Sequence, residues 1–198
     1  MLAVLGIAFV LFLPPASTNP ERAMRYRCVN NLKQVGISFP LWGMDHDGKF
    51  PMEVSAANGG TLEYVGQGGV CRHFIAMSNE LTAPRVLLCP ADKSRKAALS
   101  FSLEMADSNS SFFVGVDAVD AKPSMYLVGD RNVTNGLPLP PNRIMDLTSN
   151  SIVGWTGELH GKQGNVCLAD GSVQSWSTDQ TREGLAHTGV ATNRLAMP

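Results

Sequence analysis

His160 and Asp170 are the residues of this chain whose types and spacing best suit chemistry, with nine residues between them and Gly171 following. A histidine and an aspartate can form an acid-base pair or bind a divalent ion. A structural interpretation is stronger. Gly171 supplies the positive φ of a turn, Asp170 accepts turn amides, and His160 hydrogen-bonds nearby backbone. We favour the structural motif, and His160 and Asp170 stay candidate metal ligands.

Motifs of nucleophilic, phosphate and metalloprotease chemistry are missing from the sequence. It contains no Gly-x-Ser-x-Gly, phosphate loop, His-Glu-x-x-His or Cys-x-x-Cys. Without a nucleophile to name, we predict that the protein is not an enzyme and has no catalytic residue. A metal-dependent hydrolase using His160 and Asp170 remains the last alternative.

The four cysteines, Cys28, Cys71, Cys89 and Cys167, lie far apart in the chain. In an exported protein one or two disulfides could form, with three possible pairings of all four. We expect Cys28 to pair with Cys89, because the N-terminal helix and the end of a strand must meet. That bond requires a Cα separation below about 7 Å.

The length and net charge of the chain limit the kinds of function that it can have. With 198 residues, 44% of them hydrophobic, the chain can bury one ordinary core. Its formal net charge is −1, and no basic patch with interleaved aromatic residues occurs. Nucleic acid is therefore not an expected partner.

The N-terminal segment should position much of the rest. An apolar run from Leu2 to Leu13 ends at Pro14 and Pro15, where a helix should kink. Twelve residues make about 18 Å of helix, whereas a bilayer requires about 20 residues. The run is a membrane anchor that is short or begins before Met1, a cleaved signal, or a buried helix.

An amphipathic helix is predicted after this run. Its apolar stripe is spaced by three or four residues and consists of Met24, Cys28, Leu32, Val35, Phe39 and Trp42. Pro40 should bend or stop the helix within about a turn.

Short strands, turns and helices are predicted beyond residue 45. We predict strands at 86–88, 111–116 and 125–128, an extended stretch at 59–65 and a short helix at 72–81. Residues 165–169 and 172–176 should form a hairpin with a two-residue type I′ turn at Asp170-Gly171. Ser177 and Gln180 predict a capping box that opens a helix to about His187.

Several segments, taken in order, resemble one protein family. After the apolar run and proline come Cys28-Val-Asn-Asn-Leu-Lys-Gln-Val-Gly36 and Asp47-Gly-Lys-Phe-Pro51. Further pieces are Leu88-Cys-Pro-Ala-Asp92, Phe113-Val-Gly-Val-Asp117, Gly129-Asp-Arg-Asn132, the His160-x9-Asp170-Gly171 motif and the ending Thr192 to Pro198. Together they are similar to type II secretion pseudopilins and type IV pilin-like proteins, in the branch with a prepilin-type processing-associated His-x9-Asp-Gly domain.

The resemblance implies an α+β, pilin-like fold: a long N-terminal α-helix packed on a small antiparallel β-sheet with an elaborated C-terminal half. Residues 1–45 would be the membrane or filament stem, and residues 46–198 the globular head. The resemblance implies no cofactor. Calcium is an alternative, with oxygen ligands from Asp170, Asp179 or Asp146, although the sequence contains no EF-hand loop.

The implied function is a pseudopilin-like structural subunit of a type II secretion or type IV pilus-like assembly. Partners would be like subunits or other pseudopilins through the N-terminal helix, the inner membrane, and the secretion or pilus assembly machinery. The expected location is the inner membrane, single-pass, with the globular part in the periplasm or an extracellular fibre. The alternative is a membrane-tethered or secreted envelope binding module that does not polymerise.

Overall fold

The computed structural model describes residues 20–198, so the apolar run and the expected kink at Pro14 and Pro15 lie outside the described residues. The helices are α2 (Pro20–Gly43), α3 (Cys71–Ala76) and α4 (Thr178–Ala186). Short 3-10 helices are η1 (Pro51–Glu53), η2 (Ala56–Asn58), η3 (Leu62–Tyr64), η4 (Pro84–Leu87) and η5 (Asp107–Asn109). The strands are β1 (Phe112–Gly115), β2 (Tyr126–Asp130), β3 (Val133–Thr134), β4 (Ile144–Thr148), β5 (Gly154–Trp155), β6 (Gly164–Leu168), β7 (Val173–Trp176) and β8 (Thr192–Ala196).

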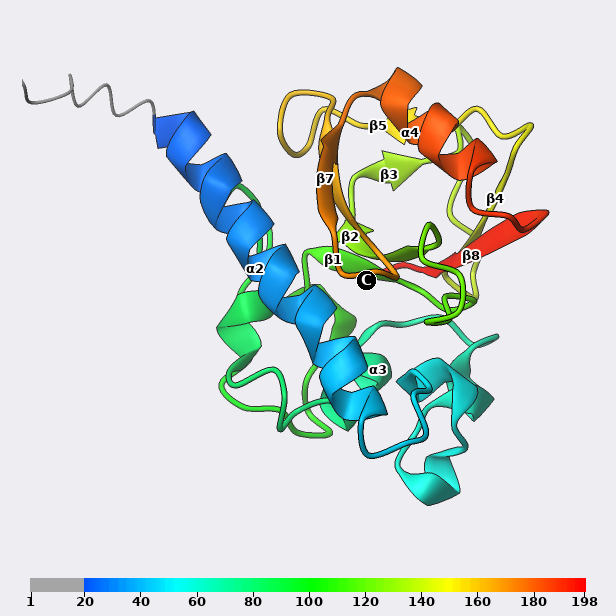
Figure 1. The fold of residues 1–198 in the computed structure, drawn as a ribbon. Coiled ribbons are helices and arrows are strands. Elements are labelled where there is room, and N and C mark those ends of the chain that lie inside the picture. The colour runs from blue at the N-terminus through cyan, green and yellow to red at the C-terminus, as the bar shows by residue number, and fades with distance from the viewer. Residues whose placement is uncertain (1–19) are drawn as a thin grey trace, which may run out of the picture.

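Six strands form one sheet in the order β4-β8-β1-β2-β6-β7, with every recorded pairing antiparallel. Strands β3 and β5 make a separate two-stranded ribbon. Figure 1 shows α2 running diagonally past the sheet, with its first turns extending beyond the globular body. The α+β class with an N-terminal helix and an antiparallel sheet is thus confirmed.

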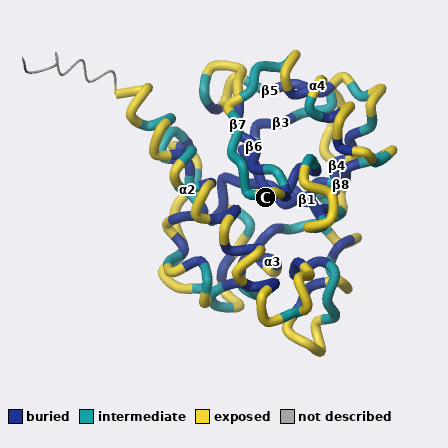
Figure 2. The backbone as a smooth tube through the Cα atoms, viewed as in Figure 1, coloured by how far each residue is buried: buried dark blue, intermediate teal, exposed yellow. Residues whose placement is uncertain are grey.

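The sheet is covered on both faces. Neighbouring residues of a strand point to opposite sides of the sheet, so one strand can contribute to two cores. Phe112 and Val114 of β1 belong to the core shared with α2, whereas Phe113 between them belongs to a second core. That second core contains Leu185 of α4 and Trp155 of β5. Figure 2 shows the buried backbone concentrated between these layers and the start of α2 largely exposed.

The predicted amphipathic stripe of α2 is buried from Cys28 onward, at Cys28, Leu32, Val35, Phe39 and Trp42. Pro40 lies inside the helix, which ends at Gly43, within the turn expected. Gly36 permits a close approach to the sheet, since a Cβ there would lie 2.3 Å from the Cys167 sulfur.

The β6–β7 hairpin forms where it was predicted, but its turn differs. Gly171 has φ +80°, whereas Asp170 does not have a positive φ, which a type I′ turn requires at both central residues. Leu168 and Ser172 face each other across the loop, because the Leu168 amide donates to the Ser172 carbonyl at 2.9 Å. The loop is therefore three residues long, with glycine in the left-handed position.

Three other predictions are corrected. Residues 59–65 contain a 3-10 turn, η3, instead of an extended stretch, and the predicted strand at 86–88 overlaps the 3-10 helix η4. Pro84 at the start of η4 favours a helical turn over a strand. The helix predicted at 72–81 is shorter than expected, because α3 ends at Ala76. The capping box of α4, at Ser177 and Gln180, forms as expected.

Within residues 20–198 no helix combines the length and apolar composition that crossing a bilayer needs. Helix α2 is 24 residues long, but its sequence is not apolar throughout, since it contains the charged residues Arg22, Arg25, Arg27 and Lys33. This finding contradicts the predicted location as a single-pass inner-membrane protein.

Candidate functional site

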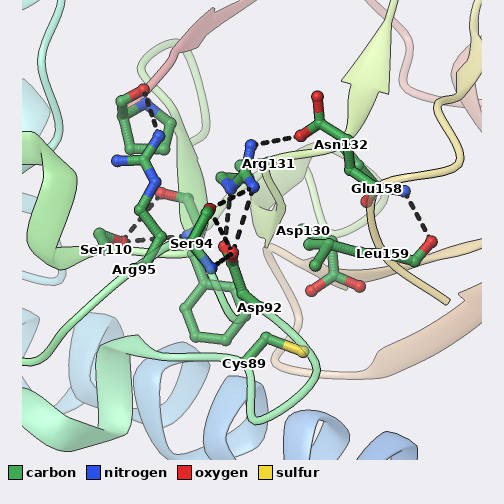
Figure 3. A network of polar contacts seen from close by, with 12 residues as sticks. Cys89, Asp92, Ser94, Arg95, Ser110, Asp130, Arg131, Asn132, Glu158 and Leu159 are labelled. Atoms are coloured by element: carbon green, nitrogen blue, oxygen red, sulfur yellow. Dashed lines mark hydrogen bonds and ion pairs between the residues drawn. The ribbon is translucent and has the colours of Figure 1, made fainter.

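Four side chains from four separate segments meet at one place, and we call them the four-residue cluster: Cys28, Cys89, Asp130 and His160. Cys28 comes from α2, Cys89 from the segment after η4, Asp130 from the end of β2, and His160 from the loop between β5 and β6. One sulfur, nitrogen or oxygen atom of each lies within 4.8 Å of all the others. Figure 3 shows the Cys89 sulfur and the Asp130 carboxylate directed toward the same region.

The contacts within the cluster are short. The Cys28 thiol donates to Asp130 Oδ1 at 3.2 Å, and Cys89 Sγ lies 3.2 Å from His160 Nε2. His160 Nε2 is also 3.4 Å from Asp130 Oδ2. Cys28 and Asp130 are fully buried, Cys89 is 1% exposed and the His160 side chain 4% exposed.

The loop carrying His160 is held by several polar contacts. His160, Gly161 and Lys162 all have positive φ, at 52°, 61° and 63°, which costs energy at the two non-glycine residues. The Asn132 side-chain amide donates to three carbonyls of this loop, those of Thr156, Leu159 and Gln163. From α2, Arg25 donates to the His160 carbonyl at 2.7 Å.

The Cys89 segment is fixed through Arg131. Its guanidinium contacts both carboxylate oxygens of Asp92, at 2.7 and 3.2 Å, and also Glu158 at 2.5 Å, as Figure 3 shows. Asn31 of α2 donates to the Leu88 carbonyl at 2.8 Å. Consecutive residues at the end of β2 therefore support the two loops that bring Cys89 and His160 to the cluster.

Asp130 itself is oriented by β6. Its Oδ2 accepts from the Asn165 backbone amide at 2.7 Å and from the Asn165 side-chain amide at 2.8 Å. Ser175 of β7 donates in turn to Asn165 Oδ1 at 2.6 Å. These contacts leave Oδ1 of Asp130 facing the Cys28 thiol.

The environment shifts the proton affinities of all four groups. Burial raises the pKa of Asp130 to about 7 and raises that of Cys28 well above its ordinary value. The neighbouring Cys28 side chain, together with His160, lowers the pKa of Cys89 to about 5. Burial opposes protonation of His160, but Cys89 and Asp130 outweigh it and raise its pKa.

This donor set is compatible with metal binding or with a Cys28–Cys89 disulfide. For nucleophilic catalysis the Cys89 sulfur would have to be reached by substrate, and it is buried. An open groove of about 850 Å³, lined by Arg22, Arg25 and Tyr26, borders the cluster at His160.

The other residues singled out in the sequence are elsewhere. Asp170 is exposed and accepts from the Ser172 amide at 2.8 Å, as in the structural interpretation, and it is not a member of the four-residue cluster. Asp146 and Asp179 are exposed on β4 and α4. His160, which was expected to hydrogen-bond backbone with its side chain, contacts Cys89 and Asp130 instead. Cys28 and Cys89 are adjacent free thiols, so their disulfide stays a prediction.

Sequence reasoning did not identify Asp130 as a partner of His160. The signal was present in the segments that carry the family resemblance, since Leu88 to Asp92, Gly129 to Asn132 and the His160 motif converge at this site. Comparison with protein-family models, with curated proteins and with solved structures found no match to this chain.

Proposed function

We propose that this protein is a pseudopilin-like structural subunit of a type II secretion or type IV pilus-like assembly, and that it joins like subunits through α2. The observation that carries the proposal is that, within residues 20–198, one face of α2 packs on the body and the opposite face is exposed. Its other face exposes large apolar side chains at Tyr26, Ile37 and Leu41, and Met44 follows directly after the helix; their exposures are 60, 51, 46 and 79%.

Helical geometry places these residues together. Tyr26 and Ile37 are 11 residues apart, about three turns, and Leu41 and Met44, one residue past the helix end, follow at spacings of four and three. We call this set the outer stripe. Scattered exposed apolar residues are ordinary, but apolar side chains that recur along one face of a helix favour a protein contact.

The partner proposed for the outer stripe is α2 of a second copy. Lys33 lies in line with Ile37 and Leu41, and Asp45 follows just past the helix end, both exposed. A parallel copy shifted by twelve residues, about 18 Å, sets Lys33 of one subunit beside Asp45 of the next. An exposed ion pair contributes at most about 1 kcal/mol, so it sets the register while apolar burial drives association.

Such a contact joins different surfaces of the two copies. A head-to-tail contact that does not close into a ring repeats indefinitely and makes a filament. This agrees with the family that the sequence resembles, in which subunits assemble through their N-terminal helices. A binding module that does not polymerise would instead stay monomeric at any concentration.

The test is self-association of the 198-residue chain, followed by sedimentation velocity and electron microscopy. Leu41→Glu should abolish concentration-dependent association and filaments, with circular dichroism unchanged. Leu103→Glu is the matched control, because Leu103 is 91% exposed and lies off the helix. Lys33→Glu should weaken association, and Lys33→Glu with Asp45→Lys should restore it. Wild-type protein that stays monomeric, or equal association by Leu41→Glu, would refute the proposal.

A further inference from the structure

The four-residue cluster contains more ligand chemistry than an assembly subunit needs. Two sulfurs, one imidazole nitrogen and one carboxylate oxygen converge from segments up to 132 positions apart in the chain, Cys28 and His160 being the outermost. We infer that Cys28, Cys89, Asp130 and His160 form a tetrahedral binding site for a zinc-like divalent metal ion.

The distances fit a tetrahedron. Zinc lies about 2.0–2.3 Å from nitrogen, oxygen and sulfur ligands, so the edges between ligand atoms measure about 3.3–3.8 Å. Two recorded edges are close to these values, 3.2 Å from Cys28 to Asp130 Oδ1 and 3.2 Å from Cys89 to His160 Nε2. His160 Nε2 also lies 3.4 Å from the other carboxylate oxygen, Asp130 Oδ2. All four atoms lie within 4.8 Å of one another, so small side-chain rotations would centre an ion among them.

The ligand types select the class of metal. Thiolate sulfur and imidazole nitrogen in a four-coordinate set favour zinc and similar transition metals. Calcium prefers six to eight oxygen ligands, and this site offers two sulfurs. The site is therefore different in kind from the calcium site considered at Asp170, Asp179 or Asp146.

The surroundings have the support that metal ligands require. A carboxylate ligand is normally held by further hydrogen bonds, and Asn165 provides two to Asp130 Oδ2, which leaves Oδ1 for an ion. Arg25 and Asn132 fix the His160 loop, and Asn31 fixes the backbone beside Cys89. Each ligand thus comes from a segment tied independently to its neighbours.

Charge also favours an ion. Asp130 is fully buried, and its recorded ion pair in residues 20–198 is with His160 alone. A buried carboxylate beside two cysteines needs a positive charge, and His160 supplies one only when its imidazole is protonated. A divalent ion would supply that charge and bind the thiols as thiolates. Because the ligands span α2 and the sheet, the bound ion would fasten the helix to the body.

The experiment measures metal in the 198-residue chain purified under reducing conditions and loaded with zinc. Elemental analysis should give one zinc per chain, and cobalt substitution should give the absorption of a tetrahedral thiolate complex. Cys28→Ser and Cys89→Ser should each lose both signals. Cys71→Ser is the matched control, because Cys71 is a buried thiol outside the cluster.

A second variant covers the case in which the cysteine variants do not fold. Asn165→Ala keeps all four ligands and removes one support of Asp130, so zinc affinity in a chelator competition should fall about 10–100-fold. Reduced wild-type protein that binds no zinc, zinc retained by Cys28→Ser, or a Cys28–Cys89 disulfide without metal affinity in the reduced form would overturn the inference.

Discussion

Acid should destabilise this protein through one buried histidine. His73 of α3 is fully buried, and its Nδ1 lies 2.8 Å from the Thr61 hydroxyl. Its Nε2 has no hydrogen-bond partner among residues 20–198. Burial lowers the pKa of His73 from 6.5 to about 4, although the Asp107 carboxylate acts in the opposite direction. The folded protein therefore resists protonation that the unfolded chain accepts.

The sign and size of the effect follow from linkage. Above pH 6.5 His73 is neutral in both states and contributes no pH dependence. Between pH 6.5 and about 4 the unfolded state binds the extra proton, so stability falls as the pH falls. At about 1.36 kcal/mol per pH unit, the full loss is about 3 kcal/mol.

The assay is urea unfolding of the wild type and His73→Asn at pH values between 7.5 and 4. Asparagine keeps a polar group near the Nδ1 position and cannot titrate in this range. The stability difference between the two proteins should shift by about 3 kcal/mol in favour of the variant on acidification. His187→Asn, at an exposed histidine after α4, controls for the loss of a histidine as such. A difference that is constant with pH would refute the reasoning.

Two further predictions concern how α2 and the cluster loops are held. Gly36→Ala should destabilise by about 1–3 kcal/mol in urea unfolding, because its Cβ would lie 2.3 Å from the Cys167 sulfur, and Cys167→Ala should relieve much of that loss. Arg131→Gln should cost about 2–3 kcal/mol at pH 7, because the buried Asp92 carboxylate loses its charged donor. Burial raises the pKa of Asp92, but the contacts with Arg131, Ser94 and Ser111 together outweigh it and lower the pKa. The cost of Arg131→Gln should therefore shrink in acid as Asp92 is protonated.

Each of these variants has a matched control. Gly66→Ala adds the same methyl group where no atom of the described residues lies within 4 Å, so it should be close to neutral. Asp179→Asn removes an exposed ion pair with Arg182 and should cost less than about 1 kcal/mol. Equal effects of variant and control would show that neither the close approach at Gly36 nor the burial of Asp92 matters.

The elements predicted best from the sequence have local causes. The stripe of α2, the β6–β7 hairpin and the capping box of α4 depend on residues within a few positions of each other. Residues 86–88 were mistaken for a strand because three consecutive apolar residues are too few to distinguish a strand from a helical turn. Pro84 favours the 3-10 helix that the structure has there. The hairpin loop is one residue longer than predicted because Asp170 stays out of the left-handed region.

The candidate site was only partly predictable, because its residues come from distant parts of the chain. His160 was singled out, and the approach of Cys28 to Cys89 followed from the need of helix and strand to meet. Asp130 is 30 positions from His160, and its carboxylate turns inward only because β2 pairs with β6. No local spacing encodes that pairing, so the partner of His160 required the three-dimensional fold.

Asp130, Arg131 and Asn132 have a consequence for how this protein can change during evolution. The three neighbours serve three tasks: a carboxylate in the cluster, a guanidinium on Asp92, and an amide on the His160 loop. Insertion or deletion of one residue here would move a guanidinium or an amide into the buried carboxylate position, so all three tasks would fail at once. We therefore expect homologues to keep the length of this segment fixed and to exchange these residues only together with their distant partners.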